Sequence, residues 1–441
     1  METPETEETP ETPETDASAA DFRMRKVRLR LSREQSLVLR RWMGGARFVY
    51  NKAVEHVRGE NKVDRSELRR RFSAQNSDLV DAYPWLAEVP YKIREQATDD
   101  VYKAQKANLA RKKKDPKHRK WTFKFKNRRN PSAWTIGVVS QAFNLASVEP
   151  RPETRKPRRD GAAFDECGVR DWTRLRLFRD RNNALGDFWA VEAIPPEVLS
   201  GKKGRCAIQR DCRISMDGLG RFYLCVPIPV TRRAPAKPAE DRSVVALDPG
   251  VRAFQTYYSP EEHGSYAEGD FSRVFSLCEK IDRYASLQAT DPSMHSACAT
   301  RQMRARHRIR NLVDEVHKKV SLDLVTRFDT VLIPEFKSKD MVQRRREDGR
   351  RRCINSKTAR SMLTWAHYRF KERLKHKASE HGKEVVVVTE EYTSKTCGKC
   401  GFVNAKFSSK TFKCASCGVE MDRDANGARN IFLKQLASPA A

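Results

Sequence analysis

The spacing of apolar residues predicts a strand followed by long helices near the start of the chain. Residues 24–31 (MRKVRLRL) alternate apolar and basic side chains, which is typical of a strand with one face toward nucleic acid. Ser32 is a favourable helix N-cap, and apolar residues then recur at helical spacing through 33–58. A second amphipathic helix is predicted at 93–109. We therefore expect residues 34–119 to form a helical module.

Short strands dominate the segment that follows this module. The stretches 174–178 and 188–194 favour strands, and CRISMD and RFYLCVPIPV flank Gly218-Leu219-Gly220, which is a hairpin signal. We expect residues 22–33 and 120–230 to form one β-barrel that the helical module interrupts.

A polar, Pro- and Ala-rich stretch at 231–241 is predicted to be a linker, and beyond it strands alternate with helices. Strands are expected at 244–247, 252–258, 330–333 and 385–388, and helices at 271–328, 358–377 and 424–433. This interleaving indicates an α/β layer. The expected fold class is multidomain α+β, with a barrel and a helical insertion followed by an α/β domain.

The net charge of the chain indicates which class of partner it would bind. Lys and Arg number 87 against 58 Asp and Glu in 441 residues, a net charge of +29. Residues 1–21 repeat Glu-Thr-Pro without Lys or Arg and predict a disordered acidic tail, and 435–441 is expected to be a C-terminal tail. The basic excess elsewhere indicates a nucleic-acid partner. We expect no membrane partner, because no apolar run approaches the roughly 18 residues of a membrane span and no signal-peptide pattern is present.

Residues 111–129 combine eleven Lys or Arg residues with three aromatic residues. Basic side chains bind phosphates and aromatic rings stack on bases, so this stretch is predicted to bind nucleic acid. A solvated charged loop and a nuclear localisation signal are the alternatives. The predicted contact residues are Lys112, Lys113, Lys114, Arg119, Lys120, Trp121, Lys124, Lys126, Arg128 and Arg129.

Four of the eleven cysteines form two CxxC pairs, Cys397/Cys400 and Cys414/Cys417, separated by thirteen residues. Paired thiolates at this spacing bind Zn²⁺ as a tetrahedron, which leaves no open position for water. The sequence therefore predicts one structural zinc ion in a ribbon. The other cysteines lack ligand spacing, and their odd number without a secretory signal favours free thiols in a reducing compartment.

Three acidic residues stand where apolar segments begin or end. Asp248 and Glu335 follow predicted strands, and Asp424 opens the last helix. Carboxylates presented in this way would hold two Mg²⁺ ions about 4 Å apart for in-line phosphodiester cleavage. Glu390, just beyond the strand at 385–388, is the reserve for Glu335. Asp422 is expected to cap the last helix or to bind a basic neighbour.

These motifs resemble the RuvC nuclease half of TnpB and of its eukaryotic relatives, the Fanzor proteins, which are cousins of type V CRISPR effectors. DGLGRFYLCVP resembles the family's barrel hairpin. The other matching stretches are ARFVYNKAV (46–54), ALDPGVRAFQTYYSP (246–260), VLIPEFKSKDM (331–341), SKTARSMLTWAHYRF (356–370), EYTSKTC (391–397) and DRDANGARNIFL (422–433).

The resemblance implies an RNase H-like (RuvC) domain formed by 242–390 and 422–434, with the zinc ribbon at 391–421 inserted as a target nucleic-acid-binding module. The barrel would be wedge-like, and the helical module would serve in recognition. By this resemblance, Asp248, Glu335 and Asp424 would be the catalytic residues and would bind two Mg²⁺ ions, with Glu390 in reserve. One Zn²⁺ falls to the four cysteines.

The resemblance further implies an RNA-guided DNA endonuclease of transposon origin, in which an omega-type guide RNA selects double-stranded DNA beside a short adjacent motif. The basic runs 111–129, 151–159, 301–310 and 344–352 would contact phosphates. The protein would act in the nucleus if eukaryotic and otherwise in the cytoplasm. The alternatives are a prokaryotic TnpB with the same chemistry and a nuclease-inactive, RNA-guided DNA-binding regulator, against which the intact carboxylates argue.

Overall fold

The computed structural model describes residues 21–58, 64–115, 124–128, 134–149, 171–178, 185–195, 198–202, 205–336, 338–343, 354–405 and 410–437. The chain divides into two compact units, Met1–Val230 and Thr231–Ala441. Nearly all of the predicted acidic tail lies outside the described residues. Within the described ranges, no helix is both long and apolar enough to span a membrane.

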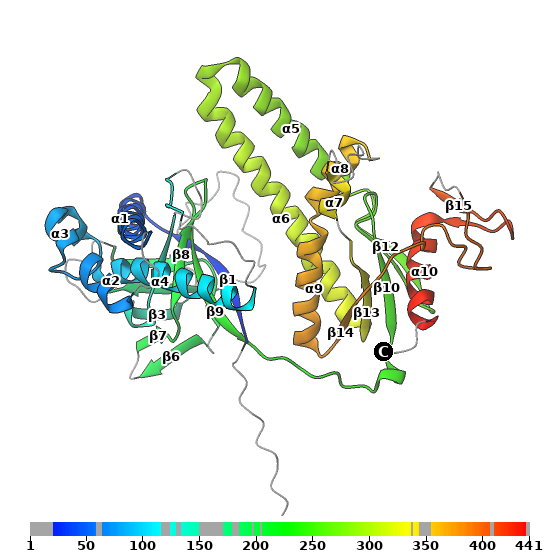
Figure 1. Ribbon diagram of the computed structural model, residues 1–441, viewed down its shortest axis with the longest axis horizontal. Coiled ribbons are helices and arrows are strands. Elements are labelled where there is room, and N and C mark those ends of the chain that lie inside the picture. The colour runs from blue at the N-terminus through cyan, green and yellow to red at the C-terminus, as the bar shows by residue number, and fades with distance from the viewer. Residues whose placement is uncertain are drawn as a thin grey trace, which may run out of the picture. The chain divides into compact units, whose positions relative to one another are not determined.

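The first unit contains a seven-stranded sheet with the order β2-β8-β9-β1-β5-β4-β3 (Figure 1). Along β1, Val27 and Leu29 are buried while Arg28 and Arg30 are exposed, as the alternation predicted. A separate hairpin joins β6 to β7. The strands are β1 (Asp21–Arg30), β2 (Thr135–Val138), β3 (Phe143–Glu149), β4 (Trp172–Leu177), β5 (Asp187–Ala190), β6 (Leu199–Lys202), β7 (Arg205–Ile208), β8 (Cys212–Met216) and β9 (Phe222–Val230).

The sheet is curled, in agreement with the predicted barrel-like fold. All pairings within it are antiparallel. Among the described residues, the end strands β2 and β3 are not hydrogen-bonded to each other. The predicted hairpin is present as β8 and β9, and Gly220 in its turn has φ +74°, which favours glycine.

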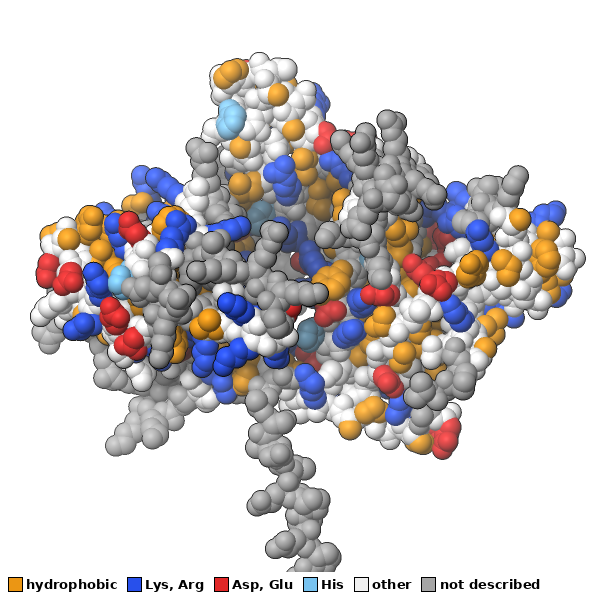
Figure 2. All heavy atoms as spheres, viewed as in Figure 1, with side chains coloured by type: hydrophobic (Ala, Val, Ile, Leu, Met, Phe, Trp, Pro, Cys, Tyr) orange, Lys and Arg blue, Asp and Glu red, His pale blue; other side chains and the backbone are white. Residues whose placement is uncertain are grey.

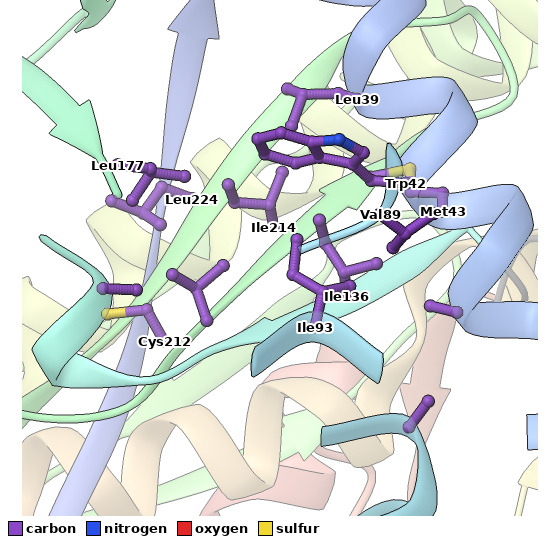
Figure 3. Close-up of a cluster of buried hydrophobic side chains, with 14 of the residues drawn as sticks. Leu39, Trp42, Met43, Val89, Ile93, Ile136, Leu177, Cys212, Ile214 and Leu224 are labelled. Atoms are coloured by element: carbon purple, nitrogen blue, oxygen red, sulfur yellow. The ribbon is translucent and has the colours of Figure 1, made fainter. Parts of the chain in front are cut away.

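Among the described residues, four α-helices stand between β1 and β2, where a helical insertion was predicted. They are α1 (Arg33–Val57), α2 (Arg65–Phe72), α3 (Asp78–Ala82) and α4 (Tyr91–Lys114). Ser32 caps α1 through a capping box: its hydroxyl accepts the Gln35 N–H at 3.1 Å, and the Gln35 side chain accepts the Ser32 N–H at 2.9 Å. Figure 3 shows Leu39 and Trp42 of α1 lying over Ile136 of β2 and Ile214 of β8 in the core of this unit.

The second unit contains a five-stranded mixed sheet with the order β12-β11-β10-β13-β14. The strands are β10 (Val244–Pro249), β11 (Gln255–Tyr258), β12 (His263–Tyr266), β13 (Thr330–Pro334) and β14 (Glu384–Val388). β13 pairs in parallel with both β10 and β14, whereas β11 is antiparallel to its two neighbours. The strand predicted at 252–258 starts only at Gln255, because residues 250–254 form a tight turn.

Helices cover both faces of this sheet and make a three-layer arrangement (Figure 1). Val245 and Leu247 of β10 pack on one face with α5, α6, α8 and α9, and Ala246 packs on the other face against Ile431 and Phe432 of α10. The helices are α5 (Phe271–Thr290), α6 (His295–Arg327), α7 (Ser338–Val342), α8 (Ser356–Trp365), α9 (His367–His381) and α10 (Arg423–Ala437). The predicted α/β layer is confirmed.

Two predicted helices are each divided. The stretch 271–328 forms α5 and α6, which pack on each other as a hairpin. The single helix predicted at 358–377 is wrong, because Ala366 has φ 52° and separates α8 from α9. Left-handed backbone is uncommon for a residue with a Cβ, and nothing in the apolar spacing reveals it.

Candidate functional site

The four predicted zinc ligands converge in a small hairpin module built on β15 (Thr411–Lys413) and β16 (Glu420–Asp422). The four Sγ atoms lie within 4.8 Å of one another. The Sγ atoms of Cys397 and Cys417 are 3.7 Å apart, and those of Cys400 and Cys414 are 3.6 Å apart. A tetrahedron with Zn–S bonds of about 2.3 Å has sulfurs about 3.8 Å apart, so these thiols fit one structural zinc ion.

Each CxxC turn ends at a glycine that lets the chain fold back around the sulfurs. The N–H of Gly401 donates to the Cys397 carbonyl at 2.9 Å, and the N–H of Gly418 donates to the Cys414 carbonyl at 3.1 Å. Both glycines have positive φ, 77° and 70°. The backbone N–H of Cys417 lowers the pKa of the Cys414 thiol, whereas burial and the neighbouring thiols raise the pKa of Cys417.

Two buried asparagines fasten the start of this module to α10. Asn430 Nδ2 donates to the carbonyls of Thr393 at 2.7 Å and Thr396 at 2.6 Å. Asn426 Nδ2 donates to the Thr396 carbonyl at 2.8 Å, and its Oδ1 accepts the Gly398 N–H at 2.9 Å. These hydrogen bonds therefore attach the zinc module to the helix whose first turn contains Asp424.

Asp248 occupies the end of β10 on the face covered by α10. It follows Ala246 by two residues, so the alternation of the strand turns both toward that helix. A Cβ placed on Gly427 would lie 2.5 Å from Asp248 Oδ2, which shows how closely the helix backbone approaches the carboxylate. Burial, followed by the charges of Asp424 and Glu390, raises the pKa of Asp248 to about 8.

Asp424 is held at the first turn of α10 by two guanidinium groups. Arg252 Nη2 donates to its Oδ2 at 3.0 Å, and Arg423 donates to its Oδ1 from Nε at 3.1 Å and from Nη2 at 2.8 Å. Asp422 caps the helix, as predicted, by accepting the N–H groups of Asp424 at 2.8 Å and Ala425 at 3.0 Å.

The two candidate glutamates lie in different surroundings. Glu335 is exposed just beyond β13, and its N–H donates to the Val388 carbonyl at 3.1 Å. Glu390 is half-buried, and burial raises its pKa. Val386 and Val388 of β14 pack on the α10 face, so continued alternation directs Glu390 toward that face as well. Glu390 is also the glutamate whose charge raises the pKa of Asp248.

The carboxylates share one neighbourhood without converging as the thiols do. In the described part of the chain, the four cysteines are the one group of three or more His, Cys, Asp or Glu residues whose ligand atoms gather at metal-binding distance. Like charges repel at short range unless a cation neutralises them. Burial is the largest cause of the raised pKa of Asp248, and the charges of Asp424 and Glu390 add to it. A divalent cation would relieve that repulsion. The donor set of carboxylate oxygens fits Mg²⁺.

The predicted nucleic-acid contacts are only partly described. Lys112, Lys113 and Lys114 are exposed at the end of α4, and Lys124 and Arg128 are exposed beyond it. Lys126 faces inward, with its Nζ 3.6 Å from Asp100 and 3.9 Å from the centre of the Tyr50 ring. Arg119, Lys120, Trp121 and Arg129 lie outside the described residues, as do the runs 151–159 and 344–352. Figure 2 shows Lys and Arg side chains on the visible face of both units.

For the phosphodiester cleavage expected from the sequence, substitution of Gly427 by alanine should lower the rate at least tenfold, because the new Cβ would displace Asp248 or α10. Nuclease activity measured beside zinc content tests this, and the zinc content should stay unchanged. Gly44→Ala is the matched control, since Gly44 also lies in a helix and a Cβ added there would meet no atom within 4 Å. Equal activity of Gly427→Ala and Gly44→Ala would show that the close approach is dispensable.

Sequence reasoning missed Arg252, Gly427, Asn426 and Asn430. The two asparagines could have been noticed, since Asn is a weak helix former. Two of them four residues apart place hydrogen-bonding side chains on one face of the helix. Arg252 carried none, because its partner is 172 residues away.

Two family profiles match parts of the chain. The profile described as "Cas12f1-like, TNB domain" matches residues 367–431, which run from α9 through the zinc module into α10. A profile described as a helix-turn-helix domain, of the OrfB/IS605 type, matches residues 23–59. In the structure this second stretch is a strand followed by a helix, β1 and α1.

Several known proteins are similar to the chain. A protein of Paramecium bursaria Chlorella virus 1, named as a transposase, is 29% identical over 95% of this chain and 88% of its own length. A TnpB-like protein of Acanthamoeba polyphaga mimivirus is 33% identical over 53% of this chain, and the match spans less than half of that protein, 45%. A Streptomyces pristinaespiralis protein, named as an RNA-guided DNA endonuclease, is 23% identical over 94% of this chain and 90% of its own.

Among solved structures, CasPhi-2 (Cas12j) bound to crRNA aligns over 94% of this chain and 98% of its own. The sequence identity is 10% and the TM-score is 0.47.

Proposed function

Because the chain belongs to the family of TnpB/IS605-type transposases and carries a Cas12f-like TNB domain, we propose that it is an RNA-guided DNA endonuclease of the Fanzor type. One observation carries the proposal: α10 approaches the end of β10 so closely at Gly427 that Asp424 and Asp248 share one electrostatic site. The zinc module that fixes α10 supports it.

In the proposed reaction, Asp248 and Asp424 would supply carboxylate oxygens to divalent cations beside the target phosphodiester. Two Mg²⁺ ions held there would activate the attacking water and stabilise the leaving 3′ oxygen. The partly buried position of Asp248 limits competition from bulk water, and the β10 end and the α10 start fix the spacing of the two acids. Zinc stays structural, because its four thiolates leave no open position.

We propose Glu390 as the third carboxylate, although the strand-Pro-Glu motif made Glu335 the first choice from sequence. The charge of Glu390 raises the pKa of Asp248, and Glu390 follows β14, whose Val386 and Val388 face α10. Glu390→Gln is expected to lower cleavage at least about a hundredfold, because a neutral amide is a weaker Mg²⁺ ligand, whereas Glu335→Gln should lower it less than tenfold. Single-turnover cleavage rates at saturating Mg²⁺ measure both variants. The reverse order of effects would return the role to Glu335.

The basic surface would hold guide RNA and target DNA. The three lysines that end α4 are exposed, and on α6 the run 301–310 exposes Arg301, Arg304, Arg306, Arg308 and Arg310. Such residues bind phosphates without reading sequence, so base pairing by the guide would supply specificity. The first unit would recognise a short motif in duplex DNA. The protein would act in the nucleus if its source is eukaryotic.

Sequencing of the RNA that copurifies with the chain tests the guide-RNA part of this proposal. We expect one discrete RNA in near-equimolar amount, with a constant segment and a variable end. A heterogeneous mixture of cellular RNA would contradict the guided mechanism and leave a nuclease that acts without a guide.

A further inference from the structure

Asp424 has both carboxylate oxygens engaged by arginines, and the two arginines differ in kind. Arg423 is the adjacent residue on α10 and moves with Asp424. Arg252 comes from the turn after β10, the strand that ends with Asp248 and Pro249, and its Nη2 lies 3.0 Å from Asp424 Oδ2. The side chain of Asp424 is 16% exposed and that of Arg252 is 39% exposed, so this ion pair is partly shielded from water. Arg252 thus bridges the two segments that carry the proposed catalytic aspartates.

The turn that carries Arg252 is rigid. Gly250 donates its N–H to the Phe254 carbonyl at 3.3 Å, and a Cβ on Gly250 would lie 2.6 Å from the Ala253 carbonyl oxygen. Phe254 is fully buried, with the rings of His317 and His367 stacked on it at centroid distances of 5.0 and 5.2 Å. Because the turn is anchored two residues beyond Arg252, the position from which the guanidinium reaches Asp424 is fixed.

We propose that Arg252 is a positioning residue that acts as a counter-ion latch: it holds Asp424 in the metal-free protein and must release Asp424 Oδ2 before a divalent cation can use that oxygen. This inference rests on the proposed nuclease function, since it concerns the same carboxylate. In the metal-free state, the Arg252 guanidinium neutralises part of the negative charge of Asp424 at Oδ2, as Arg423 does at Oδ1. When a cation takes over that role, the latch is no longer needed.

The latch predicts opposite effects on stability and on metal affinity. Removing Arg252 leaves Arg423 as the one arginine bound to Asp424 among the described residues, so the metal-free protein should unfold at a lower temperature. The same removal frees Asp424 Oδ2, so a divalent cation should bind more tightly. A half-exposed ion pair of this kind corresponds to a gain in cation affinity of about threefold to fivefold. A residue with a purely structural role would weaken the protein equally with and without metal.

The experiment titrates Mn²⁺ into the full-length, zinc-loaded chain freed of nucleic acid, with calorimetry and thermal unfolding as readouts. The variants are Arg252→Ala and Arg252→Gln, the second of which keeps a hydrogen-bond donor on a long side chain without its charge. Asp248→Ala defines the heat that does not belong to this site. Arg242→Ala is the matched control, because Arg242 pairs with Glu384 at 2.8 Å near the opposite end of β10.

We expect both Arg252 variants to bind Mn²⁺ about threefold to fivefold more tightly than the wild type, and to regain wild-type thermal stability at saturating Mn²⁺. Arg242→Ala should change Mn²⁺ affinity less than twofold. Unchanged or weaker Mn²⁺ binding by both Arg252 variants overturns the latch alone. Absence of any Mn²⁺ binding that depends on Asp248, in the wild type as in the variants, overturns the latch together with the proposed metal-dependent chemistry.

Discussion

Replacing Asp248 with alanine is expected to lower cleavage of target DNA by at least about a thousandfold, because it removes a proposed ligand of the catalytic cations. Each factor of ten corresponds to about 1.4 kcal/mol of lost transition-state stabilisation. Asp248 lies near the end of the central strand β10 and faces α10 at Gly427, and its pKa is raised by burial and by the charges of Asp424 and Glu390. Without it, the proposed site would lose one of its carboxylate ligands for divalent cations. Cleavage of plasmid DNA by the RNA-loaded protein with Mg²⁺ measures the effect.

Binding of DNA by the Asp248→Ala protein should stay within about threefold of the wild type, since the exposed basic residues that would contact phosphates are untouched. Asp282→Ala is the control, because Asp282 is an exposed carboxylate on α5 that pairs with Arg360 and is not one of the proposed metal ligands. Cleavage by Asp248→Ala at the wild-type rate would remove this residue from the chemistry. A wild-type protein that binds target DNA without cutting it would instead favour the nuclease-inactive regulator.

Replacing Cys414 with alanine is expected to release the zinc ion and to lower cleavage at least about a hundredfold, without removing any catalytic ligand. The reason is geometric. The zinc module holds residues 393–398, and Asn426 and Asn430 tie those residues to α10. Loss of the tetrahedron would free that segment and shift Asp424 away from Asp248. Zinc content by mass spectrometry and single-turnover cleavage by the same preparation test the prediction.

Cys225→Ala provides the control for this second prediction, because Cys225 lies half-buried in the first unit and outside the zinc cluster. It should retain both zinc and activity. If Cys414→Ala lost its zinc and still cleaved DNA at the rate of Cys225→Ala, the ribbon would have no part in positioning Asp424.

Much of the site could be predicted from local sequence because its chemistry follows local rules. Two CxxC turns specify a tetrahedral thiolate site by spacing alone, and the structure brings all four sulfurs together. The acidic residues that follow apolar strands could also be identified from the sequence, since a buried strand changes from apolar to polar residues where it reaches solvent. Asp422 was recognisable as a cap because Asp favours that position.

What could not be predicted depends on distant partners. The choice between Glu335 and Glu390 turns on which strand end faces α10, and that requires the packing of β13, β14 and α10 on one another. The ion pair of Arg252 with Asp424 joins segments that only the folded sheet brings together. The pairing of the end strands β2 and β3 could not be predicted either, because the pattern of apolar residues predicts strands but not which strands pair.

Reprogramming of the guide tests the central claim most directly. The purified protein is loaded with RNA whose variable segment matches one of two plasmids that carry the same flanking sequences, and cleavage is followed with Mg²⁺. The account predicts that only the matching plasmid is cut, and that exchanging the guide segment exchanges the plasmid that is cut. Cleavage of both plasmids regardless of the guide, or equal cleavage without RNA, would contradict it.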